Sequence, residues 1–202
     1  MKMNGSWHVY PRAARWRRAA FRAVVVLETG DRIAVGFDIP DLELAAVSRR
    51  NADAGAPLRR LGALGPDILQ EPPDTAAMVA RARSHSEAAI TLGELLLDQR
   101  VAAGIGNMWR AEALFACRMS PWSPVTSVSD VALHELFETA ASLMRASVVG
   151  RRPPEQAYGR SARPCRRCGT PIAAKPQGQH ARMAYWCPSC QPGDDRPRED
   201  DH

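Results

Sequence analysis

Apolar and polar positions follow a strand-like pattern in the first part of the chain. Residues 21–27 form an apolar run rich in β-branched side chains, and residues 32–37 alternate between polar and apolar side chains. A Gly-Asp pair between the two runs is a turn signal. The pattern predicts a β-hairpin, with residues 42–47 as a candidate third strand, so we expect residues 1–48 to be built from strands.

Helical spacing starts further along the chain. Asp74 is placed to cap a helix over residues 75–83, and a short helical segment over residues 87–92 follows. Ser129 is placed to cap a long amphipathic helix over residues 130–148. Because strands and helices occupy separate parts of the sequence, the expected fold class is α+β.

The stretch over residues 91–119 carries two helical faces with glycines between them. The two faces are formed by Leu92, Leu95, Leu96 and Gln99, and then by Trp109, Ala113, Phe115 and Ala116. Gly104 and Gly106 interrupt helix propagation, and Asn107 stands where a capping side chain is preferred. Such a turn leaves free N–H groups at a helix N-terminus, which suits a phosphate. The alternative is a helical hairpin whose glycines only permit tight packing, and the local pattern does not choose between the two.

The composition is that of a globular protein with a basic surplus. Of 202 residues, 45% are hydrophobic and 24% charged, the formal net charge is +5 and the isoelectric point is near 9.3. The surplus favours a polyanionic partner. No apolar run is long enough for a membrane span, and the first residues lack the apolar core of a signal peptide, so we expect a cytoplasmic protein.

Four of the five cysteines form two C-x2-C pairs, Cys165 with Cys168 and Cys187 with Cys190. Each pair can form a tight knuckle that supplies two thiolates to a tetrahedral zinc ion. Redox C-x-x-C motifs are the alternative, but neither pair opens a thioredoxin-like βαβ unit. The sequence therefore predicts one structural zinc ion, whose binding supplies the folding energy of a segment too small for a core. Cys117 lies in an apolar helical run and is expected to be a buried, inert thiol.

Basic residues surround the predicted zinc site, with two aromatic residues beside the second cysteine pair. They are Arg160, Arg163, Arg166, Arg167, Lys175 and Arg182, with Tyr185 and Trp186. Basic groups interleaved with aromatic rings suit a nucleic-acid backbone. A solvated surface is the usual alternative for scattered charge, but a metal-stabilised hairpin would hold these charges in place.

Changes in composition and the positions of Gly and Pro residues divide the chain into five expected parts. They are strands over residues 1–48, a connector rich in Gly, Pro and charge over 49–73, a helical domain over 74–154, a zinc finger over 155–191, and a charged tail over 192–202 that is expected to be disordered.

Three stretches resemble a known family. LLLDQRVAAGIGNMWRAEALF, YGRSARPCRRCGTPI and RMAYWCPSCQ are similar to the C-terminal part of the formamidopyrimidine-DNA glycosylase/endonuclease VIII family, and KMNGSW with the following strands is similar to the second part of its N-terminal β-sandwich. The resemblance implies a partial β-sandwich, a helix–two-turn–helix element and a C-terminal zinc-ribbon finger. It covers nearly the whole chain in the family's order.

The resemblance also implies a function and DNA-binding residues. Members excise damaged bases from DNA and cleave the abasic strand, so the expected partner is double-stranded DNA with a damaged base or an abasic site, bound by a monomer associated with the bacterial nucleoid. Asn107 matches the asparagine that holds phosphates, with Gly104 and Gly106 forming its turn, and Arg182 matches the zinc-finger arginine that grips phosphates beside the lesion. Met3 matches a position that fills the gap left by an extruded base. Arg160 is a further expected DNA contact.

The first residues depart from the family pattern. The family's nucleophile is an N-terminal proline followed by a glutamate, whereas this sequence begins Met-Lys-Met-Asn. We therefore expect these 202 residues to carry the family's DNA-binding elements without its catalytic residues. A start codon assigned too late explains this better than a truncated relative, because half a sandwich exposes an apolar face.

The favoured interpretation is a base-excision repair glycosylase with abasic-site lyase activity, of the endonuclease VIII-like branch. The main alternative is a non-catalytic, zinc-dependent damaged-DNA-binding protein. An RNA-binding protein with the same helical hairpin is a third reading, which the zinc ribbon and Met3 argue against.

Overall fold

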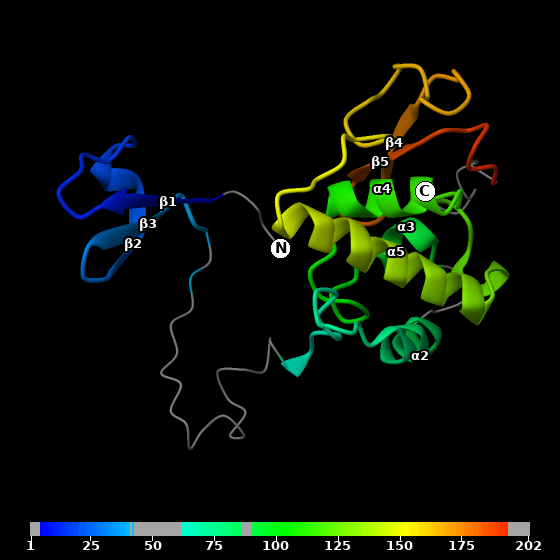
Figure 1. The fold of residues 1–202 in the computed structure, drawn as a ribbon, viewed down its shortest axis with the longest axis horizontal. Helices are drawn as coiled ribbons and strands as arrows, with labels where there is room; N and C mark the ends of the chain where they lie inside the picture. Colours follow the sequence, from blue (N-terminus) through cyan, green and yellow to red (C-terminus); the bar gives the residue numbers. More distant parts are fainter. Residues whose placement is uncertain (1–4, 41, 43–61, 86–89, 194–202) are drawn as a thin grey trace. The chain divides into compact units, whose positions relative to one another are not determined.

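The computed structural model describes residues 5–40, 42, 62–85 and 90–193, and the chain divides into two compact units, Met1–Pro57 and Leu58–His202 (Figure 1). Met3, the candidate third strand apart from Leu42, and most of the expected connector lie outside the described residues. Within the described part, no helix has the length and apolar character needed to cross a membrane.

The first unit is a three-stranded antiparallel sheet in the order β1–β3–β2. The strands are β1 Ser6–Pro11, β2 Ala23–Glu28 and β3 Arg32–Phe37. The predicted hairpin is confirmed as β2–β3, but its first strand begins at Ala23 rather than at Phe21. Phe21 belongs to a short 3-10 turn, η1 Ala20–Arg22, in which the Arg22 N–H donates to the Ala19 carbonyl at 3.1 Å. This local hydrogen bond competes with strand pairing.

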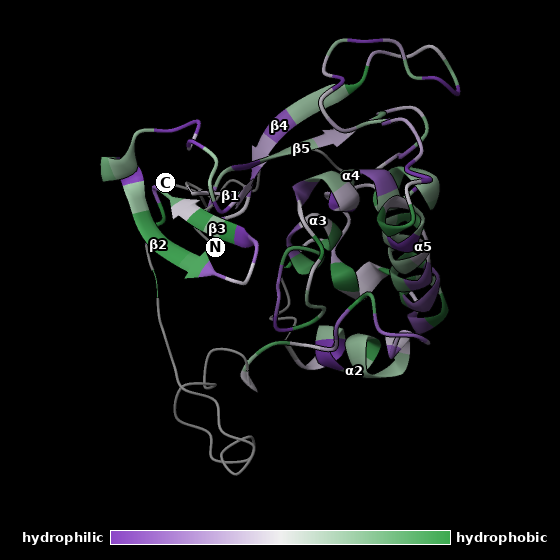
Figure 2. Ribbon diagram, turned by 60° about the vertical axis from the view of Figure 1, so that its left-hand side comes forward, coloured by the Kyte–Doolittle hydropathy of each residue, from purple (hydrophilic) through white to green (hydrophobic). Residues whose placement is uncertain are grey.

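The two faces of this sheet differ in burial, because successive side chains of a strand point to opposite faces. One face carries a small core of Tyr10, Ile33, Val35 and Phe37, against which Trp16 packs edge-on at 5.9 Å from the Phe37 ring. The opposite face presents apolar residues to solvent: Trp7, Val9 and Leu27 are 52%, 63% and 50% exposed. Figure 2 shows the apolar colouring along β2 and β3.

The second unit combines a helical domain with a two-stranded hairpin. Its elements are α2 Thr75–His85, α3 Leu92–Leu95, α4 Asn107–Ala116, η2 Val125–Ser127, α5 Asp130–Val148, β4 Ala173–Gln177 and β5 Arg182–Trp186. The helices enclose one core, in which Leu92, Leu114 and Phe137 are each at most 1% exposed. β4 and β5 pair antiparallel, and α4 contacts β5. The α+β expectation is confirmed.

The predicted caps of two helices are confirmed. The Asp74 carboxylate accepts from the Ala77 N–H at 3.0 Å, and the Ser129 hydroxyl accepts from the Ala132 N–H at 3.3 Å. These side chains satisfy amide groups that have no partner inside the helix. Helix α5 has the predicted bounds, 130–148.

The helix expected over residues 92–99 is shorter than its apolar spacing predicts. α3 ends at Leu95, where the backbone changes to tighter turns: the Leu97 and Asp98 N–H groups each donate to the carbonyl three residues earlier, at 3.0 Å. The Asp98 carboxylate then accepts from the Arg100 N–H at 2.9 Å. The Gln99 side chain then binds across the next turn. Of the short segment expected over residues 87–92, only residues from 90 onward are described, and Leu92 begins α3.

Candidate nucleic-acid interface and metal centre

The conformation of the turn before α4 is stabilised by a glycine with positive φ and by the hydrogen bonds of one amide side chain. Gly104 has a φ of 104°, which other residues rarely adopt. The Gln99 amide accepts from the Gly104 N–H at 2.8 Å and donates to the Ile105 carbonyl at 3.0 Å. A Cβ added at Gly106 would meet no described atom within 4 Å, so tight packing does not explain the glycine there.

The capping prediction for Asn107 is wrong. Gly106 is the N-cap residue of α4, and Asn107 is its first helical residue. The Asn107 side chain instead donates from Nδ2 to the Met183 carbonyl of β5 at 3.0 Å. Its Oδ1 is buried without a hydrogen-bond partner among the described residues. The contact places Asn107 beside the strand that begins with Arg182, so two predicted DNA-binding residues from distant parts of the sequence lie close together.

Arg110 was not identified from the sequence, although it is the largest fully buried side chain described. Its guanidinium donates to the Met183 carbonyl at 2.8 Å and to the Gln177 side chain at 3.2 Å. Burial, together with the charge of Arg182, lowers the pKa of Arg110 to about 10, and Glu94 opposes that shift. The only signal in the sequence was a pair of charged residues, Arg110 and Glu112, inside a largely apolar helical run.

Glu112 is a second buried charged residue that the sequence analysis missed. Its carboxylate accepts from three consecutive backbone N–H groups, those of Gln156, Ala157 and Tyr158, at 2.9, 3.0 and 2.8 Å. These residues belong to the segment between α5 and the cysteines. Glu112 therefore holds the entry to the C-terminal hairpin against α4.

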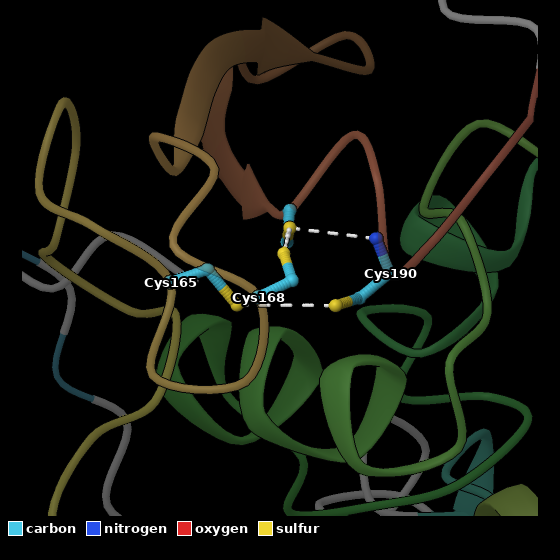
Figure 3. Close-up of side chains that lie close together, drawn as sticks. Cys165, Cys168 and Cys190 are labelled. Atoms are coloured by element: carbon cyan, nitrogen blue, oxygen red, sulfur yellow. Dashed lines mark hydrogen bonds between the residues drawn. The ribbon is translucent and has the colours of Figure 1, made fainter.

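The four paired cysteines converge beside α4, as Figure 3 shows for three of them. Their sulfur atoms all lie within 4.8 Å of one another, with separations of 3.9 Å between Cys165 and Cys190 and 3.5 Å between Cys168 and Cys187. Sulfur ligands about 2.3 Å from a tetrahedral zinc ion would be separated by about 3.8 Å. The arrangement can therefore hold a metal ion of this kind.

The fifth cysteine stands apart from this cluster. Cys117 follows α4 and is half-buried rather than fully buried. Burial raises the pKa of its thiol, which reduces the thiolate fraction and agrees with the expectation of an inert residue.

Several of the basic residues noted in the sequence make structural contacts. Arg160 donates to the Pro164 carbonyl at 2.8 Å. Arg167 donates to the Phe115 carbonyl at 2.7 Å, and its guanidinium lies 4.1 Å from the Phe115 ring centre. The Arg167 contacts attach the cysteine-bearing segment to α4, whereas the Arg160 contact lies within that segment.

Comparison with known proteins identifies the family. Residues 64–153 match the formamidopyrimidine-DNA glycosylase H2TH domain. The chain is 36% identical over 204 residues to the probable endonuclease 8 2 of Streptomyces coelicolor, a match covering 96% of this chain and 71% of the relative. The chain belongs to the formamidopyrimidine-DNA glycosylase/endonuclease VIII family. The resemblance inferred from the sequence is confirmed.

A second relative and a solved structure are also similar to this chain. The chain is 35% identical to the DNA-(apurinic or apyrimidinic site) lyase Nei2 of Mycolicibacterium smegmatis, over 95% of this chain and 73% of that protein. Its fold is similar to that of Lactococcus lactis formamidopyrimidine-DNA glycosylase bound non-covalently to DNA with an abasic site, with a TM-score of 0.71, 18% identity, and coverage of 95% of this chain and 72% of that one.

Proposed function

We propose that this chain holds damaged DNA as part of a base-excision repair glycosylase with abasic-site lyase activity, of the endonuclease VIII-like branch. The observation that carries the proposal is the hydrogen bond from Asn107 to the Met183 carbonyl, which brings the turn before α4 beside the strand of Arg182. A helix N-terminus and an arginine together suit adjacent phosphates. The names of the relatives and the DNA in the Lactococcus lactis complex support the same function.

The remaining parts of the proposal follow from the family. The four cysteines hold one zinc ion, residues 1–48 correspond to part of the β-sandwich, residues 74–154 to the helix–two-turn–helix domain and residues 155–191 to the zinc finger. The protein acts as a monomer in the bacterial cytoplasm, associated with the nucleoid. Met3 is the proposed wedge for the gap left by an extruded base, and Arg160 is a secondary contact.

Replacement of Asn107 or Arg182 by alanine tests the DNA-binding proposal. Each change is expected to weaken binding to intact duplex and to duplex with an abasic-site analogue by similar factors, because phosphate contacts carry little sequence information. Loss of Arg182 should also lower the slope of log affinity against log salt concentration by about one unit. Fluorescence anisotropy over a range of salt concentrations measures both effects.

A matched control for these variants is Gln179→Ala, which changes an exposed residue of the same hairpin. It should bind both duplexes as the parent does. A loss confined to damaged duplex would contradict the assignment of Asn107 and Arg182 to phosphates.

A polypeptide of residues 1–202 is not expected to become covalently trapped on abasic DNA by borohydride. The family's iminium forms on an N-terminal proline, whereas this sequence begins Met-Lys-Met-Asn, and a proline inside the chain has no free amine. The Mycolicibacterium smegmatis lyase is a suitable positive control in the same gel assay. Efficient trapping of the 202-residue polypeptide would require another nucleophile, with Lys2 the first to replace.

A further inference from the structure

A buried polar network joins the helical domain to the β4–β5 hairpin. Gln177, at the end of β4, is 6% exposed and donates from Nε2 to the Thr91 hydroxyl at 2.9 Å and to the Pro121 carbonyl at 2.8 Å. Its Oε1 accepts from Arg110 at 3.2 Å. A Cβ added at Gly93 would lie 2.2 Å from this oxygen, so the close approach of the hairpin to α3 depends on glycine.

The same network reaches the strand that carries Arg182. Nη2 of Arg110 donates to the Met183 carbonyl at 2.8 Å and to the Arg182 carbonyl at 3.4 Å. Asn107 donates to the Met183 carbonyl as well. Asn107 and Arg110 are three residues apart on α4, so their side chains share one face of the helix and hold the same point of β5.

The network places a charge where burial is unfavourable. Arg110 is 1% exposed, and its four acceptors are neutral oxygens, three of them backbone carbonyls. Burial of this charge costs free energy and Arg182 adds repulsion, and both lower the pKa of Arg110, whereas the Glu94 carboxylate offsets part of this effect. The planar fork of an arginine can, however, bind several oxygens in fixed directions at once. Arg110 therefore supplies the network with several hydrogen bonds in fixed directions, all of them to neutral acceptors.

We propose that Arg110 and Gln177 are positioning residues, which fix the β4–β5 hairpin against α4 so that Arg182 and Asn107 meet DNA in one preformed arrangement. The inference rests on the proposed function, because it assumes that Asn107 and Arg182 contact phosphates. Preformed contacts avoid the entropy cost of ordering the hairpin during binding. A cavity of about 300 Å³ lies beside the network, lined by both arginines and Gln177, so water can enter when the guanidinium is removed.

The test uses Arg110→Gln in the full chain with its metal, and hydrogen–deuterium exchange of the β5 amides without DNA. Exchange over residues 182–186 is expected to become about tenfold faster, while α5 exchange and metal content stay at the parent values, because only the hairpin loses its attachment. Unchanged β5 exchange would overturn the proposal. Gln179→Ala is the matched control and should leave exchange unchanged.

The second measurement is a double-mutant cycle on a duplex with an abasic-site analogue. Arg182→Ala should weaken binding about tenfold in the parent and less than about twofold in the Arg110→Gln background, because Arg182 is already misplaced there. A residue that only stabilised the fold would leave the Arg182 penalty at its parent value, and that result would overturn the proposal. If the Arg110→Gln protein loses its metal or exchanges faster in α5, both measurements are made on Gln177→Ala instead. The same results for β5 exchange and for the effect of Arg182→Ala on affinity are then expected.

This design separates the two ideas. If Asn107→Ala and Arg182→Ala leave the affinity of the parent unchanged, the DNA-binding proposal fails, and positioning for DNA fails with it. If they weaken binding while Arg110→Gln changes neither β5 exchange nor the Arg182 penalty, the DNA contacts stand and the positioning inference alone is wrong.

Discussion

A Cys187→Ser protein is expected to lose its metal ion and the order of the segment over residues 164–191. Cys187 is fully buried among the four sulfur atoms, and the segment has too few apolar residues to fold without the ion. Apparent binding free energies of structural zinc are about 10–16 kcal/mol at neutral pH, far above what one small hairpin gains by packing. With β5 disordered, Asn107 loses its carbonyl partner, and DNA affinity should fall at least about a hundredfold.

Cys117→Ser is the matched control, because the fifth thiol lies outside the cluster. It should retain one zinc per chain and bind DNA as the parent does. Elemental analysis by mass spectrometry, together with binding before and after treatment with a chelator, measures both properties. Retention of metal and affinity by Cys187→Ser would rule out the four-cysteine site.

Glu112→Ala is expected to destabilise the second unit by about 1–3 kcal/mol, since a buried N–H group left without an acceptor costs about that much. Three N–H groups lose their acceptor in this variant: the Ala157 group is buried, and the Gln156 and Tyr158 groups on either side are partly buried. The free energy of unfolding of Glu112→Gln should lie between those of Glu112→Ala and the parent. The glutamine keeps one acceptor oxygen but turns an NH2 group toward the backbone donors.

Urea unfolding followed by tryptophan fluorescence measures these differences, provided that the slope against urea stays constant. Glu138→Gln changes an exposed carboxylate on α5 and should unfold at the same urea concentration as the parent. A Glu112→Ala protein within about 0.5 kcal/mol of the parent would mean that water replaces the carboxylate, and that the linker is not held by this contact.

Local signals predicted much of this fold correctly. Asp74 and Ser129 cap their helices as expected because capping involves only a few neighbouring residues. The two C-x2-C pairs identified the cluster of four sulfur atoms for a similar reason, since each knuckle is a local structure and the ligand type limits the geometry. The β2–β3 hairpin followed from alternation around a turn.

Contacts between distant segments were not predictable from these patterns. Asn107 was expected to cap a helix, but its side chain binds a carbonyl 76 residues away. Arg110 and Glu112 would ordinarily be assigned to a solvated helix face, because the sequence does not show that a hairpin and a linker cover that face. Gln99 was placed on a predicted helical face, whereas its side chain hydrogen-bonds the backbone of Gly104 and Ile105 in the turn before α4.

The spacing of the four cysteines has a consequence for the order in which the protein matures. Cys165 and Cys168 are synthesised together, but Cys187 lies 19 residues beyond Cys168, an interval of about 1–4 s at about 5–20 residues per second. The helices are complete before either pair, so they can pack while the first two thiols still lack their counterparts. If the four cysteines hold zinc as proposed, the site cannot be completed before the second pair is synthesised, and a shortage of zinc in the cell would accumulate molecules with a finished helical core and an open finger.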